Sequence, residues 1–251
     1  RPLGIAALED KIVQAAVVTL LTPIYEAELL GFSYGFRPGR SQHDALDALA
    51  YGIGKRRINW ILDADIRSFF DTLSRPWLVR FIEHRIGDRR VIRLIRKWLD
   101  AGVLDEGRQI ETGEGVPQGA VISPLLANVY LHYVYDLWVR QWRHRHATGD
   151  MIVVRYADDT IVGFEHRHDA ERFLQDLTQR LARFGLGLHP DKTRLLEFGR
   201  GAMASRHARG LGQPETFDFL GFTHYCATRW SGGGFLLWRT LIRKRMRGKM
   251  R

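Results

Sequence analysis

The chain has very little cysteine: Cys226 is the single one among 251 residues, so no disulfide bond can form within it. Small secreted domains that rely on disulfides are therefore excluded, and a reducing compartment is indicated. A signal peptide and an apolar run of about 20 residues, the length that spans a bilayer, are also absent. From these absences we expect a soluble protein of the cytoplasm.

Acidic residues are also scarce relative to basic ones. The sequence holds 28 Asp and Glu against 38 Lys and Arg, which gives a net charge of +10 and a pI near 10.1. This balance suits a polyanionic partner, although a basic, solvated surface would have the same composition. With 45% hydrophobic residues, the chain can bury a substantial core in one or two domains.

What the sequence does contain is a pair of adjacent carboxylates at an expected hairpin tip. Asp158 and Asp159 lie between two apolar, β-branched runs at 151–154 and 160–164. Two strands joined by such a turn concentrate negative charge where a divalent metal can bind. Asp is also a common turn residue, so this motif taken alone is equally consistent with ordinary turn chemistry.

Two further segments strengthen the metal interpretation. Residues 59–66 predict another strand that ends in a carboxylate, in which the period of two places Asp63 and Asp65 on one face. Between this strand and the hairpin lies the segment 116–119, Val-Pro-Gln-Gly, which leads into a helix start at Ser123. The three segments therefore have a defined order and spacing.

In this order and spacing the segments resemble the palm of a reverse transcriptase, in the form encoded by bacterial group II introns. The resemblance covers nearly the whole chain, with matching blocks at 1–5 with Asp10 and Lys11, 33–41, 65–71, 117–119, 155–159, 188–193 and 217–222. The forms at 33–41 and 217–222 favour group II intron relatives over retroviral ones. The resemblance implies an α+β fold: a reverse-transcriptase palm, with an antiparallel sheet and packed helices, plus partial fingers.

The same resemblance implies a division of the chain. We expect partial fingers at 1–58, a palm with the catalytic site at 59–225 that includes a fingers insertion at about 75–112, and a basic segment at 226–251. That last segment would lead to a thumb, which is missing here, as is the N-terminal extension expected of the family. Whether the chain is a fragment of a longer protein stays open.

The site residues are implied by the resemblance, block by block. The catalytic residues would be Asp65, Asp158 and Asp159, and the metal set would be these three with Ile66. Two Mg²⁺ ions are expected, with Mn²⁺ as a possible substitute. Asp63 competes with Asp65 for the catalytic role, but we interpret Asp63 as a solvent-facing strand residue.

The remaining site residues follow from the other blocks. Phe70 resembles the steric gate that disfavours a ribose 2′-hydroxyl, whereas alternation assigns one of Phe69 and Phe70 to the core. The expected nucleotide-binding residues are Phe70, Gln118, Gly119, Lys192 and Arg1. The expected primer and template contacts are Arg37, Arg40, Leu220 and Gly221, although a solvated loop is an alternative for the two arginines.

The function implied is RNA-templated DNA synthesis by two-metal nucleotidyl transfer. Expected partners are an RNA template, an intron RNA above all, a DNA or RNA primer, and deoxynucleoside triphosphates, in the bacterial cytoplasm. A retron or CRISPR-associated context stays open within the same class. The alternative from a different class is an RNA-binding maturase, a splicing cofactor with a vestigial polymerase site.

Periodicity and capping signals predict the local structure that carries these blocks. Helices are expected near 12–24, 42–53, 76–86, 88–101, 123–138 and 169–184. Outside the strands already described, a short hairpin is expected at 103–116 with its turn at Gly107, and strands near 194–198, 217–225 and 235–238. The segment 199–212, rich in Gly, Ala and Arg, is expected to be a loop.

Overall fold

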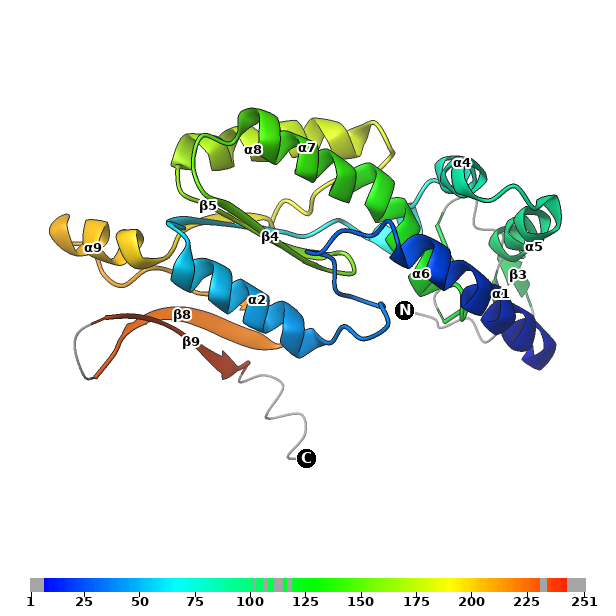
Figure 1. Cartoon of the computed structure of the whole chain (residues 1–251), viewed down its shortest axis with the longest axis horizontal. Helices are drawn as coiled ribbons and strands as arrows, with labels where there is room; N and C mark the ends of the chain where they lie inside the picture. Colours follow the sequence, from blue (N-terminus) through cyan, green and yellow to red (C-terminus); the bar gives the residue numbers. More distant parts are fainter. Residues whose placement is uncertain are drawn as a thin grey trace. The chain divides into compact units, whose positions relative to one another are not determined.

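The computed structural model describes residues 7–101, 103–105, 108–110, 115–116, 119–230 and 234–242. It combines helices with antiparallel strands, which confirms the expected α+β fold (Figure 1). The chain divides into two compact units. We call them the helical unit (1–31, 66–139 and 179–187) and the sheet unit (32–65, 140–178 and 188–251). The division into fingers and palm expected at residues 58 and 225 stays a prediction.

The helical unit is built from consecutive helices and one small hairpin. Its elements are α1 (Leu8–Glu26), α3 (Phe69–Thr72), α4 (Arg75–Arg85), α5 (Arg89–Asp100), β2 (Val103–Asp105), β3 (Arg108–Ile110), α6 (Ser123–Leu131) and the π-helical turn η1 (His132–Asp136). Gly107, the expected hairpin turn, lies outside the described residues. Aromatic rings fill the interior of this unit: Phe81 contacts Tyr130, Tyr133 and Phe184 at centroid distances of 5.0–6.0 Å.

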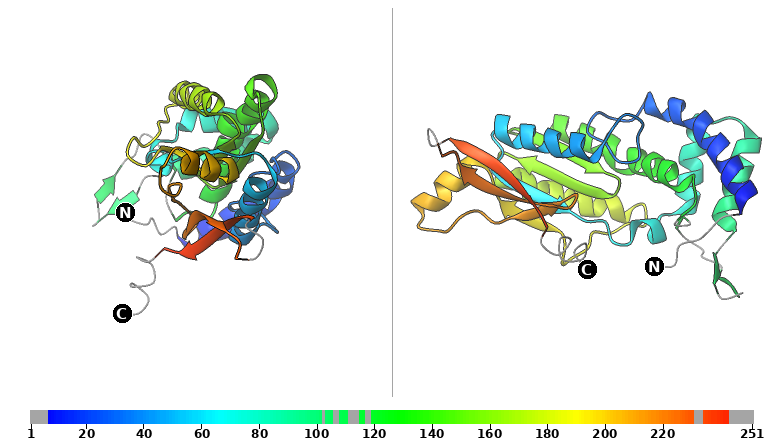
Figure 2. Two further views of the ribbon diagram at one scale, coloured as in Figure 1. Left: turned by 90° about the vertical axis from the view of Figure 1, so that its left-hand side faces the viewer. Right: turned by 90° about the horizontal axis from the view of Figure 1, so that it is seen from below.

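The sheet unit centres on a four-stranded antiparallel sheet with the order β4-β5-β1-β6. These strands are β4 (Met151–Tyr156), β5 (Asp159–Phe164), β1 (Trp60–Ala64) and β6 (Arg194–Glu197). Helices α7 (Leu137–His146) and α8 (Arg167–Ala182) cover one face, and α2 (Gln42–Lys55) covers the other (Figure 1). A second sheet of β7 (Phe217–Phe219), β8 (Phe222–Thr228) and β9 (Phe235–Leu241) forms a twisted ribbon on the α2 side (Figure 2).

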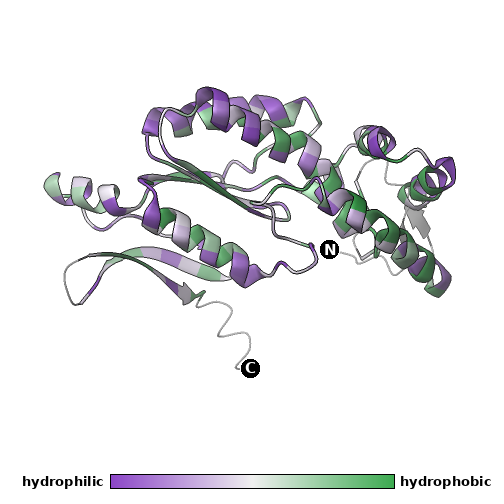
Figure 3. Ribbon diagram, in the orientation of Figure 1, coloured by the Kyte–Doolittle hydropathy of each residue, from purple (hydrophilic) through white to green (hydrophobic). Residues whose placement is uncertain are grey.

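Strand alternation explains why both faces of this sheet are covered. Ile61, Val154 and Ile161 are buried in one cluster with α2 and the β7–β9 sheet. On the other face, Phe164 packs against Phe173 of α8 at a centroid distance of 5.3 Å. Figure 3 shows strands β4 and β5 in hydrophobic colours, while α7 and α8 carry hydrophilic residues on their outer surfaces. A sheet that is apolar on both faces needs two covering layers.

The start of α2 confirms a capping prediction. The Ser41 hydroxyl accepts a hydrogen bond from the Asp44 backbone N–H, and the Asp44 carboxylate accepts one from the Ser41 N–H at 2.7 Å. This is a reciprocal capping box with Asp in the place of the usual Glu. It fixes where the loop 32–41 ends and the helix begins.

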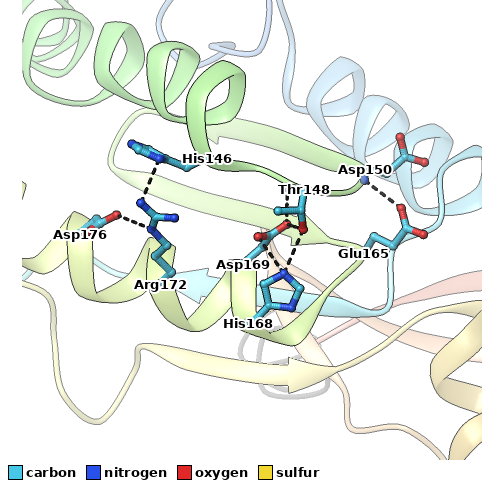
Figure 4. Close-up of polar contacts among 8 residues, drawn as sticks. All are labelled: His146, Thr148, Asp150, Glu165, His168, Asp169, Arg172 and Asp176. Atoms are coloured by element: carbon cyan, nitrogen blue, oxygen red, sulfur yellow. Dashed lines mark hydrogen bonds and ion pairs between the residues drawn. The ribbon is translucent and has the colours of Figure 1, made fainter.

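Polar contacts join the far end of the β4–β5 hairpin to α8 (Figure 4). The buried carboxylate of Asp169 accepts hydrogen bonds from the Thr148 backbone N–H at 2.8 Å and from the Thr148 hydroxyl at 3.0 Å. His168 Nε2 lies 3.3 Å from the same carboxylate. Because Asp169 lies in the first turn of α8, its charge also interacts favourably with the helix dipole.

The expected loop at 199–212 is wrong in its first half. Arg200–Ala208 forms a helix, α9, which begins after Gly199 at a φ of +127°. Ala202 of this helix is buried, and Met203 packs against the core of the sheet unit. The helix is therefore stabilised by tertiary packing, which composition alone does not reveal.

The other helices and strands lie close to their expected positions. The predicted helix from Ser123 is interrupted by the π-helical turn η1 before it continues as α7. Residues 243–251, the end of the expected basic segment, lie outside the described residues. Among the described helices, none combines the length and the apolar character needed to cross a membrane.

Candidate active site

The hairpin of β4 and β5 carries two of the three expected catalytic acids. Tyr156 pairs with Asp159, so only Ala157 and Asp158 form the turn. Ala157 has a φ of +56°, and Asp158 does not have a positive φ. A positive φ at the first turn residue alone is the pattern of a type II′ turn, which favours glycine there. The turn therefore places Asp158 at its tip. It does so by holding Ala157 in a backbone conformation that alanine rarely adopts.

The third acid reaches the same end of the sheet through β1. Ala64 pairs with Thr160 on β5. Continued by one residue, this antiparallel register sets Asp65 opposite Asp159. Side chains opposite each other in antiparallel strands point to the same face. The fold thus brings together, at one end of one sheet, acids that are 93 residues apart in the chain (158 − 65).

Lys192, one of the expected nucleotide-binding residues, lies beside Asp65. The Lys192 Nζ is 3.4 Å from Asp65 Oδ2. The segment that carries it is tied to β1, because the His189 backbone N–H donates to the Asp65 carbonyl at 2.8 Å. Two more bonds from the Lys192 and Thr193 N–H groups to the His189 carbonyl close this turn. The Lys192 ammonium is therefore positioned beside the Asp65 carboxylate.

Asp63 differs from its expected role as a solvent-facing residue. Its side chain is half-buried, and burial is the main reason that its pKa is raised to about 7. The charge of Asp159 raises this pKa further, and Arg194, its partner in β6, opposes the effect. Asp65 and Asp218 add smaller contributions. Asp63 therefore belongs to the same acidic end of the sheet, where it is half-buried rather than solvent-facing.

The acids have the right chemistry for a hard divalent cation, since Mg²⁺ prefers carboxylate and water oxygens. Besides burial, the charges of Asp159, Asp65 and Asp218 raise the pKa of Asp63, and Lys192 places a cation against Asp65. Within the part of the chain that the structure describes, however, no three His, Cys, Asp or Glu side chains converge closely enough to hold a metal ion. A shared metal site of Asp65, Asp158 and Asp159 therefore stays a prediction.

The loop before α2 packs directly against the catalytic turn. Arg155 forms an isolated parallel bridge with Ser33: its N–H donates to the Phe32 carbonyl at 2.9 Å, and its carbonyl accepts from the Tyr34 N–H at 2.8 Å. The fully buried Arg155 guanidinium donates to the Ala157 carbonyl at 2.8 Å and to the Ser33 hydroxyl at 2.7 Å. A loop distant in sequence thus contacts the turn that bears Asp158.

The two arginines expected to bind template both contact this loop. Arg37 is buried and donates to the Ser33 carbonyl at 2.8 Å. Arg40 donates to the same carbonyl at 3.4 Å and lies over the Tyr34 ring. Arg37 therefore has a structural role in the loop. Arg40 is only half-buried, and its contact with template stays a prediction.

Leu220 and Gly221 form the tight turn between β7 and β8. Both have positive φ, +49° and +86°, and Phe219 pairs with Phe222 across them. Leu220 packs against the core of the sheet unit, and its carbonyl accepts a hydrogen bond from the Gln42 side chain of α2. This turn is therefore held in a defined place, as a primer contact would require.

In the helical unit, the two adjacent phenylalanines, Phe69 and Phe70, differ in burial. Phe69 is a core residue with 1% of its surface exposed, whereas Phe70 is half-buried. The Phe70 carbonyl accepts from the Val116 N–H at 2.8 Å, and a side chain at Gly115 would lie 2.6 Å from that carbonyl. Phe70 thus keeps an accessible edge beside the segment that leads to Gly119.

Four further residues were expected in the site. Two of them, Gly119 and Ile66, belong to the helical unit. Gly119 is exposed, with a φ of +100° that only glycine adopts easily. The Ile66 side chain is a buried hydrocarbon with no ligand atom, so a metal could be bound through its backbone carbonyl. Arg1 and Gln118 lie outside the described residues, and their roles stay predictions.

Ser33, Gly35 and the side-chain role of Arg155 were missed by the sequence reasoning. The signals were present: an arginine in an otherwise apolar strand, and a glycine between two aromatic residues in a loop. A buried charge needs partners, and a loop glycine often marks a close backbone approach.

Comparisons with known proteins agree with the geometry. The family described as reverse transcriptase (RNA-dependent DNA polymerase) matches residues 1–224. Protein YkfC of Escherichia coli is 43% identical over 192 residues, which cover 64% of this chain and 50% of that protein. The group II intron-encoded protein LtrA of Lactococcus lactis is 42% identical over 132 residues, which cover 53% of this chain and 22% of that protein. The chain thus spans half or less of the length of these relatives.

Among solved structures, the apo telomerase of Candida tropicalis has a similar fold. It superposes with a TM-score of 0.61 at 14% identity, over 86% of this chain and 39% of the telomerase chain. At that identity the similarity shows a shared fold and nothing finer.

Proposed function

The chain belongs to the reverse transcriptase family, of the group II intron type, and from this premise we propose that it catalyses RNA-templated DNA synthesis by two-metal nucleotidyl transfer. The observation that carries this proposal is the strand register, which sets Asp65 opposite Asp159, next to the turn that bears Asp158. Phosphoryl transfer relies mainly on positioning and charge neutralisation. A family member whose acids lie at one end of one sheet meets that requirement.

The metal set in this proposal is Asp65, Asp158 and Asp159, with the Ile66 carbonyl. When bound, a pair of Mg²⁺ ions would neutralise the charge that develops on the attacking and leaving oxygens, and Mn²⁺ could replace them. Asp63 would add to the negative potential at this site. Lys192, now 3.4 Å from Asp65, would turn its ammonium to the departing pyrophosphate.

The substrate contacts complete the proposal. Phe70 would lie under the incoming sugar and disfavour ribonucleotides, while Gln118, Gly119 and Arg1 would contact the nucleotide. Arg40, Leu220 and Gly221 would contact template and primer. The partners would be an RNA template such as an intron RNA, a DNA or RNA primer and deoxynucleoside triphosphates. We also propose that residues 59–225 are the palm, with fingers from 1–58 and 75–112.

Asp158→Asn tests this function in the purified protein. The change removes a metal ligand but keeps the shape of the turn, so primer extension on poly(rA)/oligo(dT) with Mg²⁺ should fall at least about 1000-fold. RNA binding should be unchanged or slightly tighter, because one negative charge is lost. Asp47→Asn is the matched control: Asp47 is exposed on α2 and pairs with Arg239 at the surface, so extension should be retained.

The maturase alternative predicts a different result. If the wild-type protein binds its intron RNA tightly and promotes splicing but never extends a primer, the polymerase proposal is wrong and the acids are a relic. Retained primer extension by Asp158→Asn would likewise contradict the metal assignment.

A further inference from the structure

Three contacts converge on Ser33, which is completely buried. Its hydroxyl accepts from the Arg155 guanidinium at 2.7 Å, and its carbonyl accepts from Arg37 and Arg40. The residues on either side of it, Phe32 and Tyr34, bond the Arg155 backbone. Since Arg155 lies three residues before Asp158, this loop is connected to the catalytic hairpin by both main-chain and side-chain bonds.

The Arg155 guanidinium links Ser33 of the loop to Ala157 of the turn. It is fully buried and donates through Nη1 to the Ala157 carbonyl at 2.8 Å and through Nη2 to Ser33 at 2.7 Å. A planar guanidinium that bonds two groups in this way restricts their relative position more than a single hydrogen bond does. The carbonyl that it contacts belongs to the residue before Asp158.

That residue is where the backbone is strained. Ala157 has a φ of +56°, a region that non-glycine residues avoid unless surrounding contacts enforce it. Gly35 supplies a second contact: a side chain at Gly35 would lie 2.3 Å from the Ala157 nitrogen and 3.1 Å from its Cα. The Gly35 backbone therefore packs against the Ala157 backbone, and the Arg155 guanidinium donates a hydrogen bond to the Ala157 carbonyl.

We propose that Ser33, Gly35 and Arg155 form a turn clamp, a set of positioning residues that keeps Ala157 at positive φ and so sets where Asp158 and Asp159 point. The clamp rests on the proposed polymerase function, because it acts through the acids. It also explains the burial of Arg37, whose bond to the Ser33 carbonyl orients the loop. None of the three clamp residues needs to touch substrate.

A positioning role differs from a merely stabilising one in what it changes. Displacement of a reacting group by about 1 Å can lower a rate on the order of 100-fold without loss of substrate binding. Loosening of the clamp should therefore lower kcat and raise the Mg²⁺ concentration needed for half-maximal rate. The KM for primer–template should stay close to that of the wild type, because none of the three clamp residues needs to touch primer or template.

Gly35→Ala and Ser33→Ala are the informative variants. Gly35→Ala introduces a methyl group that collides with the turn, and Ser33→Ala removes one bond of the buried guanidinium. Gly54→Ala is the matched control, because that α2 glycine has no atom within 4 Å of an added Cβ. In the full-length protein, kcat should fall on the order of 100-fold for Gly35→Ala and by about tenfold for Ser33→Ala. Gly54→Ala should stay within about twofold of the wild type.

A rescue variant separates the clamp from general folding. Ala157→Gly makes the positive φ accessible without support. Combined with Ser33→Ala, it should recover part of the lost kcat and return the Mg²⁺ midpoint toward the wild-type value. Because a glycine at positive φ can also raise stability, the midpoint of thermal unfolding is measured for each variant, and a recovery of kcat that only follows this midpoint would count against the clamp. Hydrogen exchange of residues 156–160 should quicken in Gly35→Ala and Ser33→Ala, but not in Gly54→Ala.

The outcomes distinguish the clamp from the function on which it rests. If the wild type never extends a primer, the proposed function fails. The clamp is then decided by hydrogen exchange at 156–160 and by Mn²⁺ binding followed by electron paramagnetic resonance, with weaker binding in Gly35→Ala supporting it. If the wild type is active and both clamp variants match Gly54→Ala in kcat, Mg²⁺ midpoint and exchange, the clamp is overturned. A loss of thermal stability with no change in exchange confined to 156–160 also overturns it.

Discussion

At the scale of single residues, neighbours in sequence have opposite environments. Phe69 is in the core against Tyr130, at a centroid distance of 6.2 Å, whereas the next residue, Phe70, keeps an accessible edge. The short helix α3 rotates successive side chains by about 100°, so the two rings cannot share one role. This asymmetry allows the proposed sugar gate to be tested against a control in the adjacent position.

We expect Phe70→Ala, in an active full-length protein, to raise ribonucleotide incorporation relative to deoxynucleotide by at least about tenfold. The physical reason is loss of the ring that would exclude the 2′-hydroxyl. Competition between labelled nucleotides in primer extension measures the ratio. Phe69→Ala should instead destabilise the protein by about 3–5 kcal/mol, because it empties a buried site. The reverse pattern would move the gate to Phe69.

The choice of Asp65, Asp158 and Asp159 came from the order and spacing of the blocks that resemble the family, and the structure places them at one end of one sheet. Order and spacing were not sufficient for Asp63. Its raised pKa depends on burial and on the charges of Asp159 and Asp218, which the chain folds into place from far away. The alternation of side chains along a strand predicts which face of the sheet Asp63 is on. It does not predict which residues bury that face. The convergence of the acids on metal ions stays a prediction.

At the scale of elements, local signals succeeded where the signal and the stabilising contact are both local. The capping box at Ser41 and the aspartate cap at Asp88, which accepts from the Arg90 N–H, mark the starts of α2 and α5 as expected. The helix α9 was missed because its stability comes from Ala202 and Met203 against a distant core. Glycines at 199, 201, 210 and 212 had favoured a loop, and these tertiary contacts outweighed them.

The β7–β9 sheet contains a titratable group in its interior. His224 of β8 is completely buried and stacks on the Phe217 ring at a centroid distance of 4.9 Å. Burial lowers the pKa of His224 to about 4. The ordinary pKa of histidine is about 6.5, so between pH 6.5 and 4 the unfolded chain binds a proton that the folded chain does not.

Stability should therefore be complete above pH 6.5 and be lost as the pH falls towards 4. Between pH 7.5 and pH 5 the contribution of His224 amounts to about 2 kcal/mol. Urea unfolding at these two pH values measures it, and His224→Phe should reduce the difference by that amount. His43→Phe is the control, because His43 is exposed on α2 and its removal should leave the pH dependence unchanged. An equal pH dependence in wild type and His224→Phe would contradict the assignment.

At the scale of the whole molecule, the net charge of +10 is the dominant property. It is spread over the chain, and several arginines are neutralised by surface pairs, such as Arg209 with Glu197 at 2.6 Å and Arg167 with Glu171 at 2.7 Å. The remaining positive charge is available to phosphate groups. Each phosphate contact in a nucleic-acid complex releases counterions and makes binding sensitive to salt.

We expect the affinity of the full-length protein for single-stranded RNA to fall log-linearly with salt. Arg40→Gln should make the slope shallower by about 0.7, the value for one phosphate contact on a single strand. Arg167→Gln removes the same charge from α8, where Glu171 already pairs with it, and should leave the slope nearly unchanged. Fluorescence anisotropy over a salt series measures both. Identical slopes for the wild type and Arg40→Gln would confine Arg40 to its contacts with Ser33 and Tyr34.

The strand order β4-β5-β1-β6 also constrains how the protein folds. The β4–β5 hairpin joins neighbours in sequence and can form in about 1–10 μs. Pairing of Ala64 with Thr160 closes a loop of 96 residues (160 − 64), and such non-local contacts form slowly. On a ribosome, at about 5–20 residues per second, Asp65 emerges roughly 5–20 s before its partners. Strand β1 stays without its partner β5 during that interval, so the two halves of the acidic site meet late in folding, and the nascent chain is most exposed to mispairing along the strand that leads to Asp65.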